Sequence, residues 1–374
     1  MPTLGLYLHI PFCRSKCLYC DFCSVPHAAE ERMEAYAAAM ERDLLARAGD
    51  CRDDTVDTVY FGGGTPTCLP PEVLCGLLAT VLSRYNVAEN AEITTECNPE
   101  TVTPRDLVKL REGGFNRLSM GLQSAQAGEL RALGRLHSFA DFAETFRAAR
   151  AAGFANLSAD VMFGIPHQTA ESFADTLEKL CDLRPDHVSA YALTVEEGTP
   201  FGRRGAAALN LPDEEAVREM YLGMVEFLGK RGLAQYEISN FARAGYESRH
   251  NLKYWTLGEY LGFGPAAYSD FGGARFGNSR DIDGYLAGRD ITAECERPSA
   301  KTRASERAML GLRLARGLDS ETLGAARCAV LDRYVPAGLA KRTGDRYALT
   351  PAGMLVSNAI LSELVDFSED SSVK

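Results

Sequence analysis

Residues 4–20 read LGLYLHIPFCRSKCLYC, a short apolar run followed at once by three cysteines. The apolar run has the length and the Leu, Tyr and Ile content of a buried β-strand. Five similar runs follow, and helical patterns with apolar residues three and four positions apart lie between them. The six predicted strands are LGLYLHI (4–10), VDTVYF (56–61), AEITTEC (91–97), NRLSMG (116–121), LSADVMF (157–163) and HVSAYAL (187–193). Six such units predict an α/β fold with a parallel sheet, either open or curled into a partial (β/α)6 TIM-like barrel.

The helical patterns carry their own boundary signals. Thr103-Pro104 combines an N-cap residue with a first-turn proline, and Gly113 is expected to close the same helix. In the preceding helix, the apolar residues from Leu74 to Leu82 are expected to face the core.

The chain divides into three parts by composition. Residues 1–240 contain the predicted barrel, and residues 241–300 form a connecting segment rich in Tyr, Asn, Gly and Phe. Residues 301–374 are expected to form a small helical, winged-helix-like domain. In that domain a helix with Leu310 and Leu314 should end at Gly317, and DRYALTPAG (345–353) should form a hairpin or wing. The tail from 368 onward is expected to fray.

Length and charge exclude several classes of protein. A chain of 374 residues exceeds the ~250–300 residues of one core, and 46% hydrophobic with 24% charged residues is typical of a globular protein. The net charge of −11 argues against a non-specific nucleic-acid or anionic-membrane binder. No apolar run reaches the ~18 residues of a membrane span, and the first residues lack a basic signal-peptide region. The expected location is therefore the cytoplasm.

The cysteine spacing is the first chemical signal. Cys13, Cys17 and Cys20 form C-x3-C-x2-C, and three thiolates can bind three irons of a cubane while the fourth iron stays open to a small molecule. Two alternatives remain at this point. With Cys23 as a fourth ligand the loop could hold structural zinc, although four ligands within eleven residues strain a tetrahedron. The cysteines could also be unrelated neighbours in a loop.

A glycine run follows the second predicted strand. Residues 62–66 read GGGTP, and consecutive glycines let backbone N–H groups approach a ligand closely. Such runs are also common in tight turns, so this signal is weak by itself.

Seven motifs occur in a fixed order along the chain: YLHIPFC-x3-C-x2-C, GGGTPT, TTECNPE, SMGLQS, LGRLH, SADVMFGIPHQT and AYALTVEEGTPF. Together they resemble the radical S-adenosylmethionine (SAM) superfamily, in its coproporphyrinogen III oxidase-like family, over nearly the whole chain. The resemblance implies a [4Fe–4S] cluster on Cys13, Cys17 and Cys20, with SAM chelated to the open iron. It also implies cofactor contacts for eight further residues: Tyr7, Gly63, Gly64, Thr65, Glu96, Gln123, Arg135 and Asp160.

These residue types suit the implied ligand. Carboxylates such as Glu96 and Asp160 can accept hydrogen bonds from ribose hydroxyls or the methionyl amine, and Arg135 can pair with the methionyl carboxylate. Taken one at a time, each could equally form an ordinary ion pair or a helix cap. His9 is expected to bond a backbone carbonyl rather than to orient the cluster.

The family that the chain resembles includes two functions. One is oxygen-independent coproporphyrinogen III oxidase, which decarboxylates propionates with a 5′-deoxyadenosyl radical; the other is a heme chaperone. The oxidase pattern has a further cysteine where this chain has Phe22, and a longer segment before its first cysteine, where this chain has twelve residues before Cys13. Both differences argue against oxidase activity.

The sequence HNLKYW at 250–255 resembles the HNxxYW motif of the heme-chaperone branch. An exposed His250 is expected to ligate heme iron, and Tyr254 and Trp255 offer flat faces for the macrocycle. Either Lys253 or Arg249 is expected to meet the propionates. The alternative is a histidine in a polar loop packed against the barrel end.

The sequence thus predicts a heme chaperone that binds heme and transfers it to apo-hemoproteins such as membrane cytochromes, with peripheral contact at the membrane during delivery. Coproporphyrinogen III oxidase is the alternative. Nucleic acid is not an expected partner, although residues 301–353 contain ten Lys and Arg against five Asp and Glu. A homodimer is left open.

Overall fold

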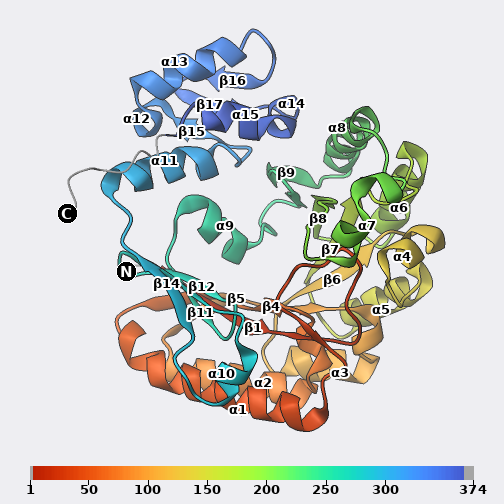
Figure 1. Cartoon of the computed structure of the whole chain (residues 1–374), viewed down its shortest axis with the longest axis vertical. Helices are drawn as coiled ribbons and strands as arrows, with labels where there is room; N and C mark the ends of the chain where they lie inside the picture. Colours follow the sequence, from red (N-terminus) through yellow and green to blue (C-terminus); the bar gives the residue numbers. More distant parts are fainter. Residues whose placement is uncertain (1–2, 366–374) are drawn as a thin grey trace.

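The computed structural model describes residues 3–365, in which one curved sheet is covered by helices on its outer side (Figure 1). The predicted tail at 368–374, and with it the end of the predicted third domain, lies outside these residues.

The centre of the sheet consists of six parallel strands in sequence order, β1-β4-β5-β6-β7-β8. Their bounds are Thr3–Ile10, Thr55–Gly63, Val87–Cys97, Arg117–Gln123, Asn156–Phe163 and His187–Ala192. All six predicted strands are therefore confirmed, and so is the α/β fold with a large parallel sheet. In parallel strands joined by helices the carboxyl ends share one rim, and this rim carries the site described below.

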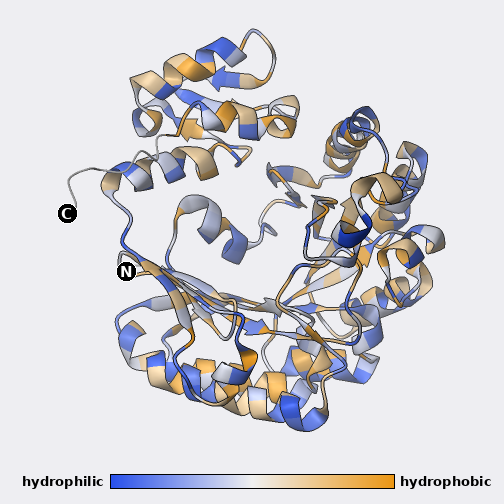
Figure 2. Cartoon of the chain, in the orientation of Figure 1, coloured by the Kyte–Doolittle hydropathy of each residue, from blue (hydrophilic) through white to orange (hydrophobic). Residues whose placement is uncertain are grey.

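Helices pack on the outer face of this sheet. They are α1 (Glu30–Arg47), α2 (Pro71–Arg84), α3 (Pro104–Glu112), α5 (Phe139–Ala151), α6 (Ala170–Asp182) and α8 (Glu214–Lys230). In Figure 2 these helices carry hydrophilic positions next to hydrophobic ones, as expected of amphipathic helices with one face on the sheet.

The predicted start of α3 is confirmed. The Thr103 hydroxyl accepts from the N–H of Asp106 at 3.3 Å, and the Asp106 carboxylate accepts from the N–H of Thr103 at 2.9 Å. Such a capping box stabilises a helix by roughly 1 kcal/mol. The expectation that Leu82 faces the core is wrong, because Leu82 is 45% exposed near the end of α2.

The sheet extends beyond the six strands at both ends. At one end β10 (Asn240–Ala242) and β9 (Ala234–Glu237) pair antiparallel after β8. At the other end β11 (Tyr260–Phe263) runs parallel to β1, and β12, β13 and β14 continue antiparallel. The bounds of these last three strands are Tyr268–Phe271, Ala274–Asn278 and Thr292–Glu296. The stretch 241–300 thus adds four strands to the barrel sheet.

The C-terminal part lies across the open side of the curved sheet. It contains α11 (Ala300–Gly311), α12 (Ser320–Leu323), α13 (Ala325–Tyr334), α14 (Pro351–Leu355) and α15 (Ser357–Ser362). The predicted hairpin is present as β16 (Ala340–Thr343) and β17 (Arg346–Leu349), which pair with the short β15 (Leu318–Asp319). Leu314 lies beyond α11, contrary to expectation, and forms a bridge to Glu237.

Across residues 3–365, no helix combines the length and the apolar content needed to cross a membrane.

Candidate functional site

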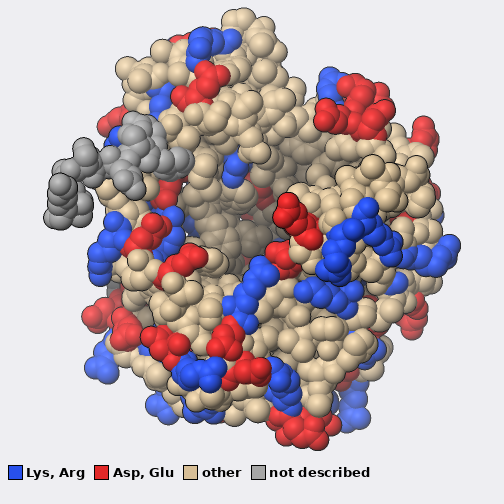
Figure 3. Space-filling view, viewed as in Figure 1, with Lys and Arg blue, Asp and Glu red and all other residues tan. Residues whose placement is uncertain are grey.

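A cavity of about 660 Å³ opens at the carboxyl-end rim of the barrel. Figure 3 shows that this face of the molecule is hollowed between the barrel and the C-terminal part. Ten of the twelve residues predicted for the site line this one cavity: Cys13, Cys17, Cys20, Gly63, Gly64, Thr65, Glu96, Gln123, Arg135 and Asp160. Tyr7 and His250 do not line it.

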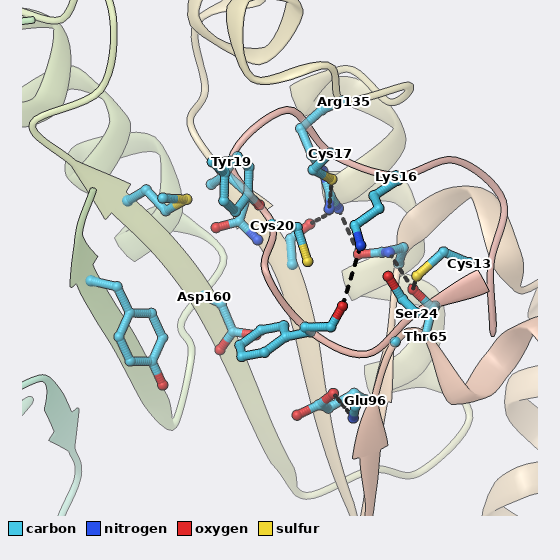
Figure 4. Close-up of a pocket in the computed structure, with 18 of the residues that line it drawn as sticks. Cys13, Lys16, Cys17, Tyr19, Cys20, Ser24, Thr65, Glu96, Arg135 and Asp160 are labelled. Carbon is cyan, nitrogen blue, oxygen red and sulfur yellow. Dashed lines mark hydrogen bonds between the residues drawn. The ribbon is translucent and has the colours of Figure 1, made fainter. Parts of the chain in front are cut away.

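The three cysteines lie in one loop at the cavity (Figure 4). Backbone contacts fasten this loop at its base and in its middle. The short strands β2 (Phe12–Cys13) and β3 (Val25–Pro26) pair in parallel and close the base of the loop. In the middle, the N–H of Leu18 donates to the carbonyl of Leu133 at 3.1 Å, and its own carbonyl accepts from Phe201 at 3.0 Å. The backbone of the loop is therefore held at both of these points.

A chain of hydrogen bonds joins the first cysteine to the second. Cys13 Sγ lies 3.7 Å from Thr65 Oγ1, which accepts from Asn98 Nδ2 at 2.9 Å. Asn98 Oδ1 accepts from Arg135 Nη2 at 2.5 Å, and Arg135 Nη1 donates to Cys17 Sγ at 3.5 Å. Hydrogen bonds to cluster sulfurs are among the features that set the properties of an iron–sulfur centre.

The glycine run supplies a close backbone approach. Gly63 has φ +114°, and a Cβ at this position would lie 2.5–2.9 Å from the His9 ring. A Cβ on Gly64 would lie 2.7 Å from the carbonyl oxygen of Phe12. Both glycines are therefore required where β4 passes the cysteine loop.

Two carboxylates line the cavity wall. Glu96 accepts from the hydroxyl of Tyr60 at 2.8 Å and from the N–H of Gly63 at 3.2 Å, and Asp160 accepts from Ser119 Oγ at 3.2 Å. Burial inside the barrel raises the pKa of Glu96 to about 7 and also raises the pKa of Asp160. Both groups can exchange these hydrogen bonds for bonds to a ligand's hydroxyl or amine groups.

Gln123 ends β6 in the left-handed region, with φ +67°. This conformation is uncommon outside glycine and turns the chain sharply at the cavity rim.

The donor set fits a cluster with one open iron. Cys13, Cys17 and Cys20 all line the cavity, whereas Cys23 belongs to the hydrophobic core and does not. Within residues 3–365, the Cys23 thiol thus lies apart from the other three, whereas the zinc alternative requires all four thiols around one ion. Arg135 and Thr65 place donors beside two of the three sulfurs, as a thiolate ligand needs.

Tyr7 lies just outside the cavity wall. Its hydroxyl bonds His9 Nδ1 at 3.1 Å, and its ring stacks on Tyr60 with 6.2 Å between centroids. His9 Nε2 donates to the carbonyl of Cys23 at 2.9 Å, so the expected bond to a backbone carbonyl is confirmed.

The expectation of an exposed His250 is wrong. His250 is 1% exposed on α9 (Arg249–Thr256), where Nδ1 bonds Thr58 Oγ1 at 2.9 Å and Nε2 bonds the Tyr254 hydroxyl at 2.8 Å. Burial lowers its pKa to about 3, so the imidazole is neutral. With both ring nitrogens bonded inside the barrel, the imidazole is not free to ligate heme in this structure.

Sequence reasoning missed several residues of the cavity. Asn98 lies within the quoted TTECNPE motif, and Arg117 comes two residues before SMGLQS. Tyr191 and Asn251 also line the cavity, the second from α9. Their inward direction follows from strand alternation for Arg117 and Tyr191, but for Asn251 it depends on where α9 packs.

Comparison with known proteins agrees with this site. The family model of the radical SAM superfamily matches residues 7–180. A curated heme chaperone HemW from Mycobacterium tuberculosis is 36% identical over 368 residues, covering 96% of this chain and 94% of that protein. The chain belongs to the HemW family of the radical SAM superfamily. HemW from Bacillus subtilis is 33% identical over 371 residues, covering 95% of this chain and 97% of that protein.

The fold of this HemW-family chain is shared with a solved structure. Coproporphyrinogen III oxidase (HemN) from Escherichia coli superimposes with a TM-score of 0.84 at 23% identity, covering 98% of this chain and 91% of that chain. This match shows a common architecture only. Membership in the superfamily implies a [4Fe–4S] cluster and SAM, in agreement with the cavity chemistry.

Proposed function

We propose that this protein is a heme chaperone that binds heme and passes it to apo-hemoproteins. Support comes first from its similarity, over nearly its whole length, to curated heme chaperones. The observation that carries the proposal in this structure is an apolar rim around the cavity that also contains the cysteine loop.

Large apolar side chains at the rim are unusually exposed to solvent. Phe22 is 69% and Leu136 62% exposed, the highest values for large hydrophobic residues in the described range 3–365, and both line the cavity. Tyr191 also lines the cavity and is 43% exposed. Apolar surface concentrated at one mouth typically marks a binding site, and a flat macrocycle would cover it.

Cations stand next to this rim. Arg14, Lys16 and Arg280 line the same cavity. Arg280 pairs with Asp21 at 3.1 Å, but both side chains are about half exposed or more, so the pair is weak and exchangeable. Heme combines an apolar plane with two carboxylates, and this mouth offers groups for both.

The cysteine loop adds a second element to the same site. SAM bound at a [4Fe–4S] cluster supplies one-electron chemistry in this superfamily. The residues of this chain would position it. The three cysteines would hold the metal, Arg135 donates to Cys17 Sγ and is itself held by Asn98, and Glu96 and Asp160 offer acceptors in the cavity. In this proposal the loop both seats the cluster and, through Phe22, contacts the cargo.

The proposed setting is the cytoplasm, with peripheral contact at the membrane when the acceptor is a membrane cytochrome. Whether the chaperone acts as a homodimer is to be measured by light scattering with and without SAM.

A hemin titration tests the proposal. Wild-type protein should shift the Soret band, and Phe22→Ser should weaken hemin affinity roughly 10-fold or more, because a Phe side chain gains about 1.5–3 kcal/mol on burial. The matched control is Leu82→Ser, which removes an exposed apolar side chain from α2, away from the cavity, and should leave affinity unchanged. Absence of any Soret change with wild-type protein would remove the proposal.

A second assay separates the chaperone from the oxidase alternative. Reconstituted protein incubated anaerobically with SAM, a reductant and coproporphyrinogen III should form no protoporphyrinogen. Turnover would instead assign the oxidase activity.

A further inference from the structure

Arg117, the first residue of β6, is a buried cation with no hydrogen-bond or close ion-pair partner among residues 3–365. Its side chain is 1% exposed and lines the cavity. Across residues 3–365 the guanidinium forms neither an ion pair within 4.0 Å nor a hydrogen bond, and Nε and Nη1 are both buried and unbonded. Buried polar groups are nearly always bonded, so each exception requires an explanation.

The carboxylates around Arg117 are occupied by other donors. Glu92 accepts from the backbone N–H groups of Arg249 at 3.0 Å and His250 at 3.1 Å, at the start of α9. Glu96 and Asp160 accept from Tyr60, Gly63 and Ser119, as described above. These acids lower the cost of the charge from a distance, but none of them satisfies the guanidinium.

An unpaired guanidinium in this place calls for an anion. Arginine stays protonated in proteins, and an uncompensated buried ion costs several kcal/mol. The planar guanidinium fork matches a carboxylate with two parallel hydrogen bonds. The cavity beside Arg117 is open to such a group, with Ser119 and Asn251 on the same wall.

This position is distinct from the cysteine loop. Arg135 donates to Cys17 and to the carbonyl of Gly121, near the carboxyl end of β6. Arg117 lies four residues earlier on the same strand, which is about 13 Å away at 3.3 Å per residue. Arg117 therefore starts from the amino end of β6, whereas Arg135 contacts the carboxyl end of the same strand.

We propose that Arg117 is a binding residue for a carboxylate at the inner end of the cavity. The carboxylate comes either from a propionate of the macrocycle or from a small free carboxylate such as an amino acid. The first source rests on the proposed heme-chaperone function, and the second does not.

The first experiment compares hemin with hemin dimethyl ester, in which both propionates are uncharged. Wild-type protein should prefer hemin, and Arg117→Gln should reduce this preference at least about 10-fold, the loss typical of a charge-assisted hydrogen bond. Arg105→Gln, which removes an exposed arginine of α3 that does not line the cavity, is the matched control for general loss of positive charge and should leave the preference unchanged. Arg117→Lys keeps the charge but loses the fork, so it should reduce the preference by a smaller factor.

The second experiment uses sodium propionate and L-methionine in thermal unfolding of cluster-free protein. If the carboxylate is small and free, either probe raises the Tm of wild-type protein but not of Arg117→Gln. This experiment does not depend on heme. If hemin does not bind but propionate or methionine raises the Tm, the proposed heme-chaperone function is wrong and the carboxylate site at Arg117 stands.

Ligand-free stability distinguishes a binding residue from a structural one. Because the Arg117 guanidinium makes no hydrogen bond or close ion pair within residues 3–365, Arg117→Gln breaks no direct contact and should leave the Tm of ligand-free protein close to that of wild type. The opposite result is a lower Tm for Arg117→Gln together with an unchanged preference for hemin and an unchanged response to the small carboxylates. That result would show that Arg117 is a structural partner of Glu92, and it would overturn the proposal. If Arg117→Gln does not fold, the same comparisons with hemin, its dimethyl ester, propionate and methionine are made with Arg117→Lys. Values equal to those of wild type in that variant would also overturn the proposal.

Discussion

At the scale of single residues, Glu96 shows how the barrel interior changes a carboxyl group. Its oxygens face the cavity and accept from Tyr60 and Gly63, yet burial raises its pKa to about 7. The folded state therefore binds a proton between pH 4.5 and about 7 where the unfolded chain has released it. Stability contributed by this proton is present at acid pH and is lost as the pH rises through 7.

Replacing Glu96 by Gln should remove this dependence. In cluster-free protein, the free energy of unfolding of wild type relative to Glu96→Gln should fall by roughly 2–3 kcal/mol between pH 5 and pH 8. Urea unfolding at a series of pH values measures the difference. The control is Glu34→Gln, which removes an exposed carboxylate of α1 and leaves the barrel interior unchanged. A pH-independent difference for Glu96→Gln would show that the carboxyl titrates normally.

Single residues of the site differ in how far the sequence reveals them. Cys13, Cys17 and Cys20 are visible from spacing alone, since ligands of one cluster must be close along the chain. Asn98 gives no such signal, because it follows the end of β5, where strand alternation no longer applies. For Arg117, alternation along β6 gives the inward direction but does not show that the guanidinium lacks a bonding partner. Their roles depend on which strand lies opposite, and that information appears only in the folded barrel.

At the scale of elements, α9 is the least expected part of the structure. The Glu92 carboxylate accepts from its first N–H groups, and the His250 imidazole inserts between Thr58 and Tyr254. The His250 ring also stacks on Tyr60 at 5.2 Å. The helix is thus anchored into the barrel by the histidine that the motif led us to expect at the surface.

Removing His250 should first damage the fold. His250→Ala should lower the free energy of unfolding by about 2–4 kcal/mol, since it leaves a cavity and two unpaired hydroxyls. Thr58→Val is the matched variant, because it removes one of the two hydrogen bonds and keeps the imidazole, and it should cost about 1 kcal/mol. Urea unfolding measures both values.

Hemin titration of the same two variants tests ligation directly. If His250 anchors α9 and does not bind iron, the folded fraction of both variants should give the wild-type Soret position. A displaced Soret maximum in His250→Ala alone would restore this histidine as a heme ligand.

The strands of the large sheet differ in what stabilises them: burial for the six parallel strands, and pairing with a neighbour for β11 to β14. The six parallel strands are buried, so their apolar runs identify them in the sequence. The strands β11 to β14 lie near the sheet edge, and β14 is exposed along its whole length. Such short, mixed segments become strands only by pairing with a neighbour, which explains why the sequence predicts a connecting segment at 241–300 and no strands there.

At the scale of the whole molecule, the barrel and the C-terminal part meet at β9, the strand at one end of the large sheet. The N–H of Ala315 donates to the carbonyl of Tyr236 at 2.9 Å, and Leu314 bridges to Glu237. Glu237 is fully buried and accepts from the N–H of Ser239 at 2.8 Å and from Asn240. Burial raises its pKa to about 7, so the junction carries a second proton that the unfolded chain would lose at lower pH.

The stability of the ligand-free protein should therefore decline above neutral pH for two separate reasons. Because Glu237 does not line the cavity that contains Glu96, the two effects should add. Between pH 5 and pH 8, wild type should lose roughly 4–6 kcal/mol relative to the double variant Glu96→Gln/Glu237→Gln, and about half of this relative to either single variant. Calorimetry across this range measures the three differences.

The buried, neutral His187 and His250 act in the opposite direction, because their lowered pKa values withdraw stability as the pH falls below 6.5. They are present in every variant and cancel in the comparison, so a double variant that follows the wild-type pH profile would contradict the assignment of both buried protons.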